Sequence, residues 1–240
     1  MLVYPSGIEL SSSTLRHLAR LLSARRLERK TRWRRLTTDR QALLILAHLR
    51  CGHTYAQLAA GFGIGIATVN RYADEAVDAL STLAPDLATA VRAAGRKAFV
   101  ILDGTLLAID RVAADRLYYS GKHKRHGMNV QVIADPFGRL LWASPALPGT
   151  VHDIRAARTH GVIAALTEAD LRCWADKGYQ GAGGTVLVPF RGPHARIRAL
   201  GEQAMATLKA WRLLRKLRCS TTRVTDLGKA VLTLHPTTAS

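Results

Sequence analysis

The sequence predicts an α/β domain with a mixed sheet, preceded by an all-α region. Two observations predict this. Apolar residues recur at helical spacing until about residue 97, and the spacing then changes to a period near two. Beyond that change the expected elements follow one another as strand, hairpin, helix, strand and helix, an order that is typical of mixed α/β folds.

The composition favours a protein that binds nucleic acid. Lys and Arg outnumber Asp and Glu by 35 to 17, which gives a formal net charge of +18. Phosphate contacts release condensed counterions, so basic excess of this kind is typical of DNA-binding proteins. The alternative is a basic protein from an arginine-rich source, but the charge is clustered.

The sequence also indicates where the protein works. It has no apolar run that could cross a membrane, and its N-terminus lacks the pattern of a secretion signal. Its three cysteines are widely spaced, which fits neither a disulfide framework nor a zinc motif. We therefore expect a cytoplasmic protein with no membrane partner.

Residues 1–38 predict a helix followed by a basic arm, because leucines at helical spacing give way to a run of arginines and lysines over 25–35. Residues 39–97 predict a helix-turn-helix domain, ending at a boundary near Gly95. Its expected helices cover 41–50, 55–60 and 66–80, with a further helical stretch over 81–97.

The helix-turn-helix prediction rests on three small or apolar positions. Ala59 would let two helices cross closely, Gly63 could adopt the positive φ of the turn, and Val69 would fill the shared core. The second helix would then present Thr68, Asn70 and Arg71 to a DNA groove. The alternative is an ordinary helical hairpin.

Residues 98–240 predict the α/β domain. The turn Asp135-Pro-Phe-Gly should join two strands of a hairpin, and Thr150 and Asp153 have the spacing of a helix capping box. The expected strands cover 98–103, 128–134, 140–146, 171–175 and 185–188, and the expected helices cover 153–166 and 194–218.

Three acidic residues have the setting of metal ligands. Asp103 and Asp176 each end an apolar strand, and Glu202 lies among arginines on the last helix. If the two strands are neighbours, their carboxylates converge and repel one another unless a cation lies between them. Two Mg²⁺ ions could then support in-line displacement at a phosphodiester. The alternatives are two simple turns and a surface Glu202 paired with Arg198.

Basic side chains flank these acids in the sequence and predict contacts with DNA phosphates. One group precedes the hairpin and another lies on the charged stripe of the last helix. For any one residue of the first group, a solvated loop is the alternative. The two groups are Lys122, His123, Lys124, Arg125 and His126, and Lys209, Arg212 and Lys216.

Five segments of the sequence resemble insertion-sequence transposases of the DDE superfamily, in the bacterial branch related to Harbinger transposases. Together with the helix-turn-helix, the resemblance covers nearly the whole chain. The segments are VILDGT at 100–105, YYSGKHKRHGMNVQV at 118–132, LPGTVHD at 147–153, ADKGYQG at 175–181 and EQAMATLKAWRLLRKLR at 202–218.

The resemblance implies a ribonuclease-H-like catalytic fold over 98–240, with Asp103, Asp176 and Glu202 as a catalytic and metal-binding triad for two Mg²⁺ or Mn²⁺ ions. It also implies cut-and-paste transposition on double-stranded DNA, at terminal inverted repeats and at a target site. Transposition requires the two ends of the element to be brought together, so we expect a homodimer. Asp153 is a rival for the second acid, but in this fold that acid should follow the later strand, which favours Asp176.

Two departures from the family pattern leave a second hypothesis open. The stretch between Gly181 and Glu202 is short, with an apparent deletion at 190–194, and Gly201 costs a helix about 1 kcal/mol. The chain could therefore be a catalytically defective remnant that only binds DNA. A ribonuclease acting on RNA is less favoured, because a helix-turn-helix suits duplex DNA.

Overall fold

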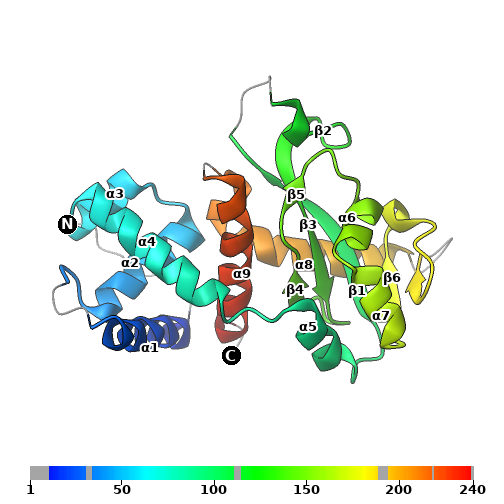
Figure 1. The fold of residues 1–240 in the computed structure, drawn as a ribbon, viewed down its shortest axis with the longest axis horizontal. Helices are drawn as coiled ribbons and strands as arrows, with labels where there is room; N and C mark the ends of the chain where they lie inside the picture. The colour runs from blue at the N-terminus through cyan, green and yellow to red at the C-terminus, as the bar shows by residue number, and fades with distance from the viewer. Residues whose placement is uncertain (1–10, 31–33, 111–114, 189–193, 218, 239–240) are drawn as a thin grey trace. The chain divides into compact units, whose positions relative to one another are not determined.

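The computed structural model describes residues 11–30, 34–110, 115–188, 194–217 and 219–238, and Figure 1 shows its helices and strands. The chain divides into two compact units. The first comprises the described residues up to Ala84, Ala210–Leu214 and those from Lys229 onward; the second comprises Pro85–Lys209 and Arg215–Gly228. The boundary expected near residue 97 falls within the second unit, because the helix over Leu87–Ala94 packs on the sheet.

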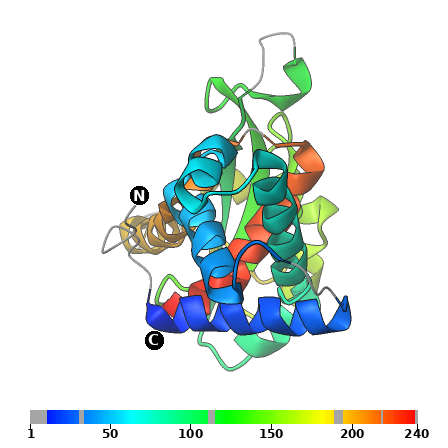
Figure 2. The ribbon, with the colours of Figure 1, turned by 90° about the vertical axis from the view of Figure 1, so that its left-hand side faces the viewer.

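Four helices build most of the first unit. Ser11, Thr37 and Thr54 accept backbone N–H groups as N-caps, and Thr54 forms a reciprocal capping box with Gln57. Helix α1 packs against α2 and α4, and Figure 2 shows it in dark blue. The four helices are α1 (Ser12–Glu28), α2 (Thr38–Cys51), α3 (Tyr55–Phe62) and α4 (Ile66–Ser81).

A mixed sheet organises the second unit. The central strand β1 pairs antiparallel with β3 and parallel with β6, and β6 pairs parallel with β7. The order β2-β3-β1-β6-β7, with β4 and β5 also pairing with β3, confirms the ribonuclease-H-like fold class. The strands are β1 (Val100–Ala108), β2 (Tyr119–Ser120), β3 (Arg125–Ala134), β4 (Leu140–Ala143), β5 (Leu147–Pro148), β6 (Cys173–Ala175) and β7 (Val186–Leu187).

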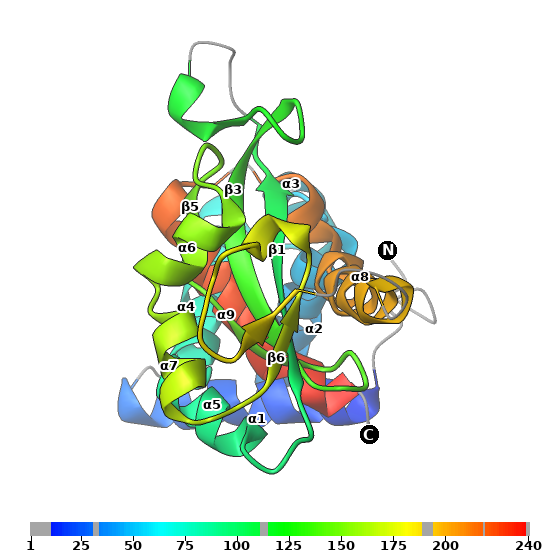
Figure 3. The same ribbon diagram turned by 90° about the vertical axis from the view of Figure 1, so that its right-hand side faces the viewer.

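Helices cover both faces of this sheet. Figures 1 and 3 show α6 and α7 on one face and α8 on the other. Val100 and Leu102 of β1 belong to the core on the α6 and α7 face, so Ile101 and Asp103 point to the opposite face. The remaining helices are α5 (Leu87–Ala94), α6 (Asp153–Thr159), α7 (Val162–Glu168), α8 (His194–Ala210) and α9 (Thr221–Thr238), with 3₁₀ turns at Arg116–Tyr118, Lys177–Tyr179 and Arg212–Arg215.

The expected hairpin is confirmed. The carboxylate of Asp135 accepts the N–H groups of Phe137 (2.8 Å) and Arg139 (3.0 Å), and Gly138 has a φ of 75°, which favours glycine. Non-local packing explains why the expected ends of other strands and helices are wrong. Strand β1 runs on to Ala108 because β3 pairs with it that far.

Three expected helices are shorter than the sequence indicated. The helix over 153–166 is two helices, broken where Gly161 has a φ of 69°. The helix over 194–218 ends at Ala210, where the Arg215 side chain donates to the carbonyl of Lys209 and so satisfies its last turn (2.7 Å). Residues 82–86 interrupt the stretch over 81–97, and Asp86 then caps α5.

Candidate active site and DNA-binding surface

Asp103 and Asp176 lie at adjacent points on neighbouring strands. The parallel register of β1 and β6 pairs Leu102 with Ala175, and each aspartate is the next residue. The expectation that their strands are neighbours is thus confirmed. One detail differs: Asp103 lies within β1 rather than at its end, because pairing with β3 continues beyond the last partner in β6.

The two aspartates belong to the same face of the sheet. Ala175 shares the α6 and α7 core with Leu102, so the alternation of side chains directs Asp103 and Asp176 to the α8 face. On that face α8 passes close to Asp103: a Cβ added to Gly201 would lie 3.0 Å from Oδ2 of Asp103. The glycine that looked like a helix defect therefore makes room for a carboxylate.

The pKa of Asp103 is raised to about 6, mainly by burial and next by the charge of Asp176. The hydrogen bond from the Gly104 N–H acts in the opposite direction and lowers this pKa. That N–H donates to Oδ1 of Asp103, and the N–H of Gly178 donates to Oδ1 of Asp176, both at 2.8 Å. Within the described residues no donor reaches either Oδ2. Two converging carboxylates with open oxygens suit a hard divalent cation such as Mg²⁺.

Asp153 has a different environment. It is buried, Lys122 Nζ lies 2.8 Å from its Oδ2, and Asn129 Nδ2 donates to its Oδ1 at 2.8 Å. Gly104 points to the α6 and α7 face, and an added Cβ there would collide with Asp153 and Gln131. Both oxygens of Asp153 are thus engaged by protein donors on that face.

The expected capping box at the start of α6 is wrong. Thr150 donates its hydroxyl proton to the carbonyl of Leu117, and His152 is the N-cap without a side-chain bond. A buried polar network replaces the box. Gln131 donates to Asn129 Oδ1 (2.8 Å) and accepts a hydrogen bond from the hydroxyl of Tyr179. These bonds fix the orientations of both side-chain amides. Sequence reasoning missed Asn129 and Gln131; their polar character inside an apolar strand was the available signal.

Glu202 is exposed on α8, directly after Gly201. In the parts of the chain that the structure describes, no three His, Cys, Asp or Glu side chains stand close enough to form a metal cage. The structure therefore pairs Asp103 with Asp176 and places the helix of Glu202 beside them, without bringing its carboxylate into a ligand cluster. The suspected deletion at 190–194 falls largely outside the described residues, which resume at His194.

Four basic side chains gather at the acidic pair: Lys122 and Lys209 each interact electrostatically with Asp103, and the other two lie beside these lysines. Burial first, and then the charges of Lys122 and Arg125, lower the pKa of His123. Burial, and next the charge of Arg125, lower the pKa of Lys209 on α8, while Asp103 raises it. Burial and neighbouring positive charge both disfavour the charged forms of His123 and Lys209. The four are Lys122, His123, Arg125 and Lys209.

The other residues expected at phosphates lie differently. Lys124 is exposed in the β2–β3 turn with a φ of 51°, and His126 stacks edge-on against Tyr119 with 5.2 Å between ring centres. Arg212 and Lys216 do not continue the stripe of α8, because the helix ends at Ala210. Arg212 belongs to the first unit, and Lys216 lies 3.5 Å from Asp110 in the second.

The first unit contains the helix-turn-helix. Ala59 and Val69 are buried, and Gly63 ends α3 with a φ of 65°, so the three steric expectations are confirmed. Asn70 and Arg71 are exposed near the start of α4, and Thr68, which accepts from Arg71 Nη2 at 3.2 Å, is half-buried. In helix-turn-helix proteins the N-terminal residues of the recognition helix contact bases.

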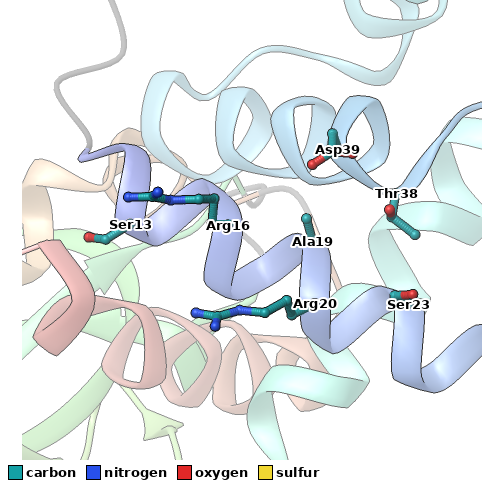
Figure 4. A pocket seen from close by; sticks show the side chains of 7 residues that line it. All are labelled: Ser13, Arg16, Ala19, Arg20, Ser23, Thr38 and Asp39. Atoms are coloured by element: carbon teal, nitrogen blue, oxygen red, sulfur yellow. The ribbon is translucent and has the colours of Figure 1, made fainter.

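Two open grooves lie on this unit. One follows the turn of the helix-turn-helix and is lined by Arg35, by the glycines of the turn and by Thr68. The other lies between α1 and the start of α2, where Arg16 and Arg20 flank a groove that also contains Asp39 (Figure 4). The second groove therefore has mixed charge.

A ribonuclease-H-like sheet with paired carboxylates, joined to a DNA-reading helical unit, defines a class: nucleases that act on DNA phosphodiesters. Residues 102–235 match the family of DDE superfamily endonucleases, and residues 34–86 match the helix-turn-helix of DDE superfamily endonucleases. The chain is also 31% identical over 209 residues to a putative transposase for insertion sequence element IS112 from Streptomyces albus G, covering 79% of this chain and 76% of that protein.

The chain thus belongs to the DDE superfamily of endonucleases, as an insertion-sequence transposase with an N-terminal helix-turn-helix. It is an enzyme of the nuclease and transposase class, and its helix-turn-helix binds DNA. None of the described helices combines the length and apolar character needed to cross a bilayer.

Proposed function

We propose that this enzyme cuts and joins DNA at the terminal inverted repeats of its own element by two-metal in-line displacement. The adjacent carboxylates of Asp103 and Asp176 on the α8 face are the observation that carries the proposal. Glu202 would supply the third carboxylate from α8. When bound, two divalent ions would neutralise charge on the attacking and leaving oxygens.

The chain's own groups would bind and orient the DNA. Lys122, Arg125 and Lys209 would hold phosphates beside the acidic pair. Water attacks phosphorus at the element end, the P–O3′ bond breaks, and the departing 3′ oxygen takes up a proton. The freed 3′-hydroxyl then loses its proton and attacks a target phosphodiester in line, displacing the target's 3′ oxygen. Two ends must react together, so we expect two copies in the working complex.

The test uses the purified chain, a duplex with one element end, and Mg²⁺. We expect a strand break at the element end that requires Mg²⁺ and that is absent from a scrambled duplex. Specific binding without any break would support a DNA-binding remnant instead, and would contradict the proposed catalysis.

Between the rival acids, we propose Asp176 as the second ligand and Asp153 as the residue that positions Lys122. The support is that Lys122 and Asn129 occupy both oxygens of Asp153, whereas Oδ2 of Asp176 has no donor among the described residues. Asp153 packs against Gly104, and its carboxylate lies close enough to the acidic pair for its charge to raise the pKa of Asp103. Its ion pair with the half-exposed Lys122 would direct the ammonium toward a phosphate.

A comparison of Asp153→Asn with Asp176→Asn separates these roles. Asp153→Asn should leave the Mg²⁺ concentration for half-maximal cleavage within about twofold of the wild-type value. It should lower the affinity for DNA. It should also lower the free energy of unfolding by about 2 kcal/mol, because charge-assisted hydrogen bonds are lost. Asp176→Asn should abolish the response to Mg²⁺. Metal titrations of cleavage give both values, and a greatly raised Mg²⁺ requirement in Asp153→Asn would make Asp153 the ligand.

A further inference from the structure

The backbone just before α2 is fastened to the recognition helix α4 by one phenol. The hydroxyl oxygen of Tyr72 accepts the N–H of Arg35 (3.1 Å) and the N–H of Leu36 (3.4 Å). Tyr72 is only 2% exposed, so these contacts lie away from competing water. The segment at Arg35 is therefore fixed relative to α4 and not free to move as an arm.

The neighbours of Arg35 are used internally. The Arg34 guanidinium lies 5.6 Å from the centre of the Tyr72 ring, and its Nη2 donates to buried Glu75 at 2.9 Å. Gln41 donates to the other oxygen of Glu75 at 3.1 Å, so that carboxylate is satisfied. Leu36 is buried, whereas the side chain of Arg35 is exposed.

Arg35 reaches the surface in the groove along the turn of the helix-turn-helix. The groove is also lined by Gly63, Gly65 and Thr68, and none of the described residues that line it is acidic. In the described part of the chain, no atom lies within 4 Å of where a Cβ would stand on either glycine. Among the described residues, the floor of the groove is thus open backbone beside the start of α4, and Arg35 is the one charged residue that lines it.

We propose that Arg35 binds a DNA phosphate next to the bases that α4 reads, and that Tyr72 is the residue that positions it. This inference rests on the proposed binding of element ends by the helix-turn-helix. A phosphate is the partner that the chemistry fits, since a guanidinium donates in a fixed fork that matches phosphate oxygens. The anchored backbone lowers the conformational entropy that this contact would otherwise cost.

A double-mutant cycle tests the proposal on the full chain. Arg35→Ala, Tyr72→Phe and the double variant are titrated onto two labelled duplexes, one with the element end and one scrambled, by fluorescence anisotropy at several salt concentrations. Tyr72→Phe keeps the buried ring and removes only the hydroxyl. Thermal denaturation and circular dichroism establish that each variant is folded.

Arg35→Ala should weaken binding to both duplexes by about fivefold to tenfold and reduce the salt slope by about one, as expected for a single phosphate contact. Tyr72→Phe should weaken binding by a smaller factor of about threefold. The double variant should bind no more weakly than Arg35→Ala, because the hydroxyl acts through that arginine.

Arg20→Ala is the matched control, since Arg20 is also an exposed arginine of the first unit but lines the other groove (Figure 4). Equal effects of Arg20→Ala and Arg35→Ala would overturn the proposal, as would additive effects of Arg35→Ala and Tyr72→Phe. Wild-type protein that binds both duplexes equally would instead contradict the proposed reading of element ends, which is a separate failure.

Discussion

Asp103→Asn should reduce DNA strand cleavage by at least about 10³-fold, because it removes a charge that a divalent ion would need. The same change should not destabilise the metal-free protein near neutral pH. Its carboxylate is buried and faces the charge of Asp176, and both raise its pKa to about 6. Single-turnover cleavage and urea unfolding measure the two effects. The matched control is Asp110→Asn, since Asp110 lies just beyond the same strand and is half exposed.

The raised pKa of Asp103 fixes the sign of a pH effect on stability. An ordinary Asp side chain has a pKa near ~3.9, so between about pH 4 and pH 6 the folded state binds a proton that the unfolded state has lost. The metal-free wild type should therefore gain about 1.4 kcal/mol of stability as the pH falls from 7 to 5, because pH 5 lies about one unit below the folded pKa. Asp103→Asn should lack this gain, and Mg²⁺ should reduce it in the wild type. Equal pH slopes in EDTA for both proteins would contradict the assigned environment.

Moving the carboxylate of Glu202 by one residue should abolish most cleavage. Glu202→Gln should lower the rate by about 10²–10³-fold, the loss expected when one group that stabilises transition-state charge is removed. Glu202 is exposed, so stability should change by less than about 0.5 kcal/mol. Adding Gln203→Glu restores the charge of the helix but places it about 100° around the helix axis.

The double variant should therefore remain as inactive as Glu202→Gln. Gln203→Glu alone is the control and should stay near wild-type activity, because the Gln203 side chain packs by Gly138 and not by the acidic pair. Wild-type cleavage by the double variant would mean that α8 contributes only general negative charge. In that case Glu202 would not be the third ligand.

Local steric rules explain which parts of the molecule the sequence could predict. Ala59, Gly63 and Val69 define the helix-turn-helix because each acts on residues only a few positions away. The adjacency of Asp103 and Asp176 could be predicted because each directly follows an apolar run, and these two runs pair in parallel. The 135–138 turn could be predicted because Asp and Gly determine its backbone locally.

The features that sequence reasoning missed depend on distant partners. Asp153 looks like a helix cap in the sequence, but Lys122 and Asn129 reach it from another part of the chain. Gly201 looks like a defect in α8, but the approach of Asp103 gives a reason for its missing side chain. The end of α8 at Ala210 likewise depends on tertiary packing around Arg215 rather than on a local breaker.

The central claim is that the carboxylates of Asp103, Asp176 and Glu202 hold divalent ions at one point. Fe²⁺ with hydrogen peroxide in place of Mg²⁺ tests it most directly. The bound iron reduces peroxide to hydroxide and a hydroxyl radical, which cuts the nearby polypeptide, and mass spectrometry locates the cuts. We expect wild-type protein to be cut near Asp103, Asp176 and Glu202, and Asp103→Asn to lose all three cuts. Cuts that avoid α8, or a pattern that Asp103→Asn leaves unchanged, would contradict the claim.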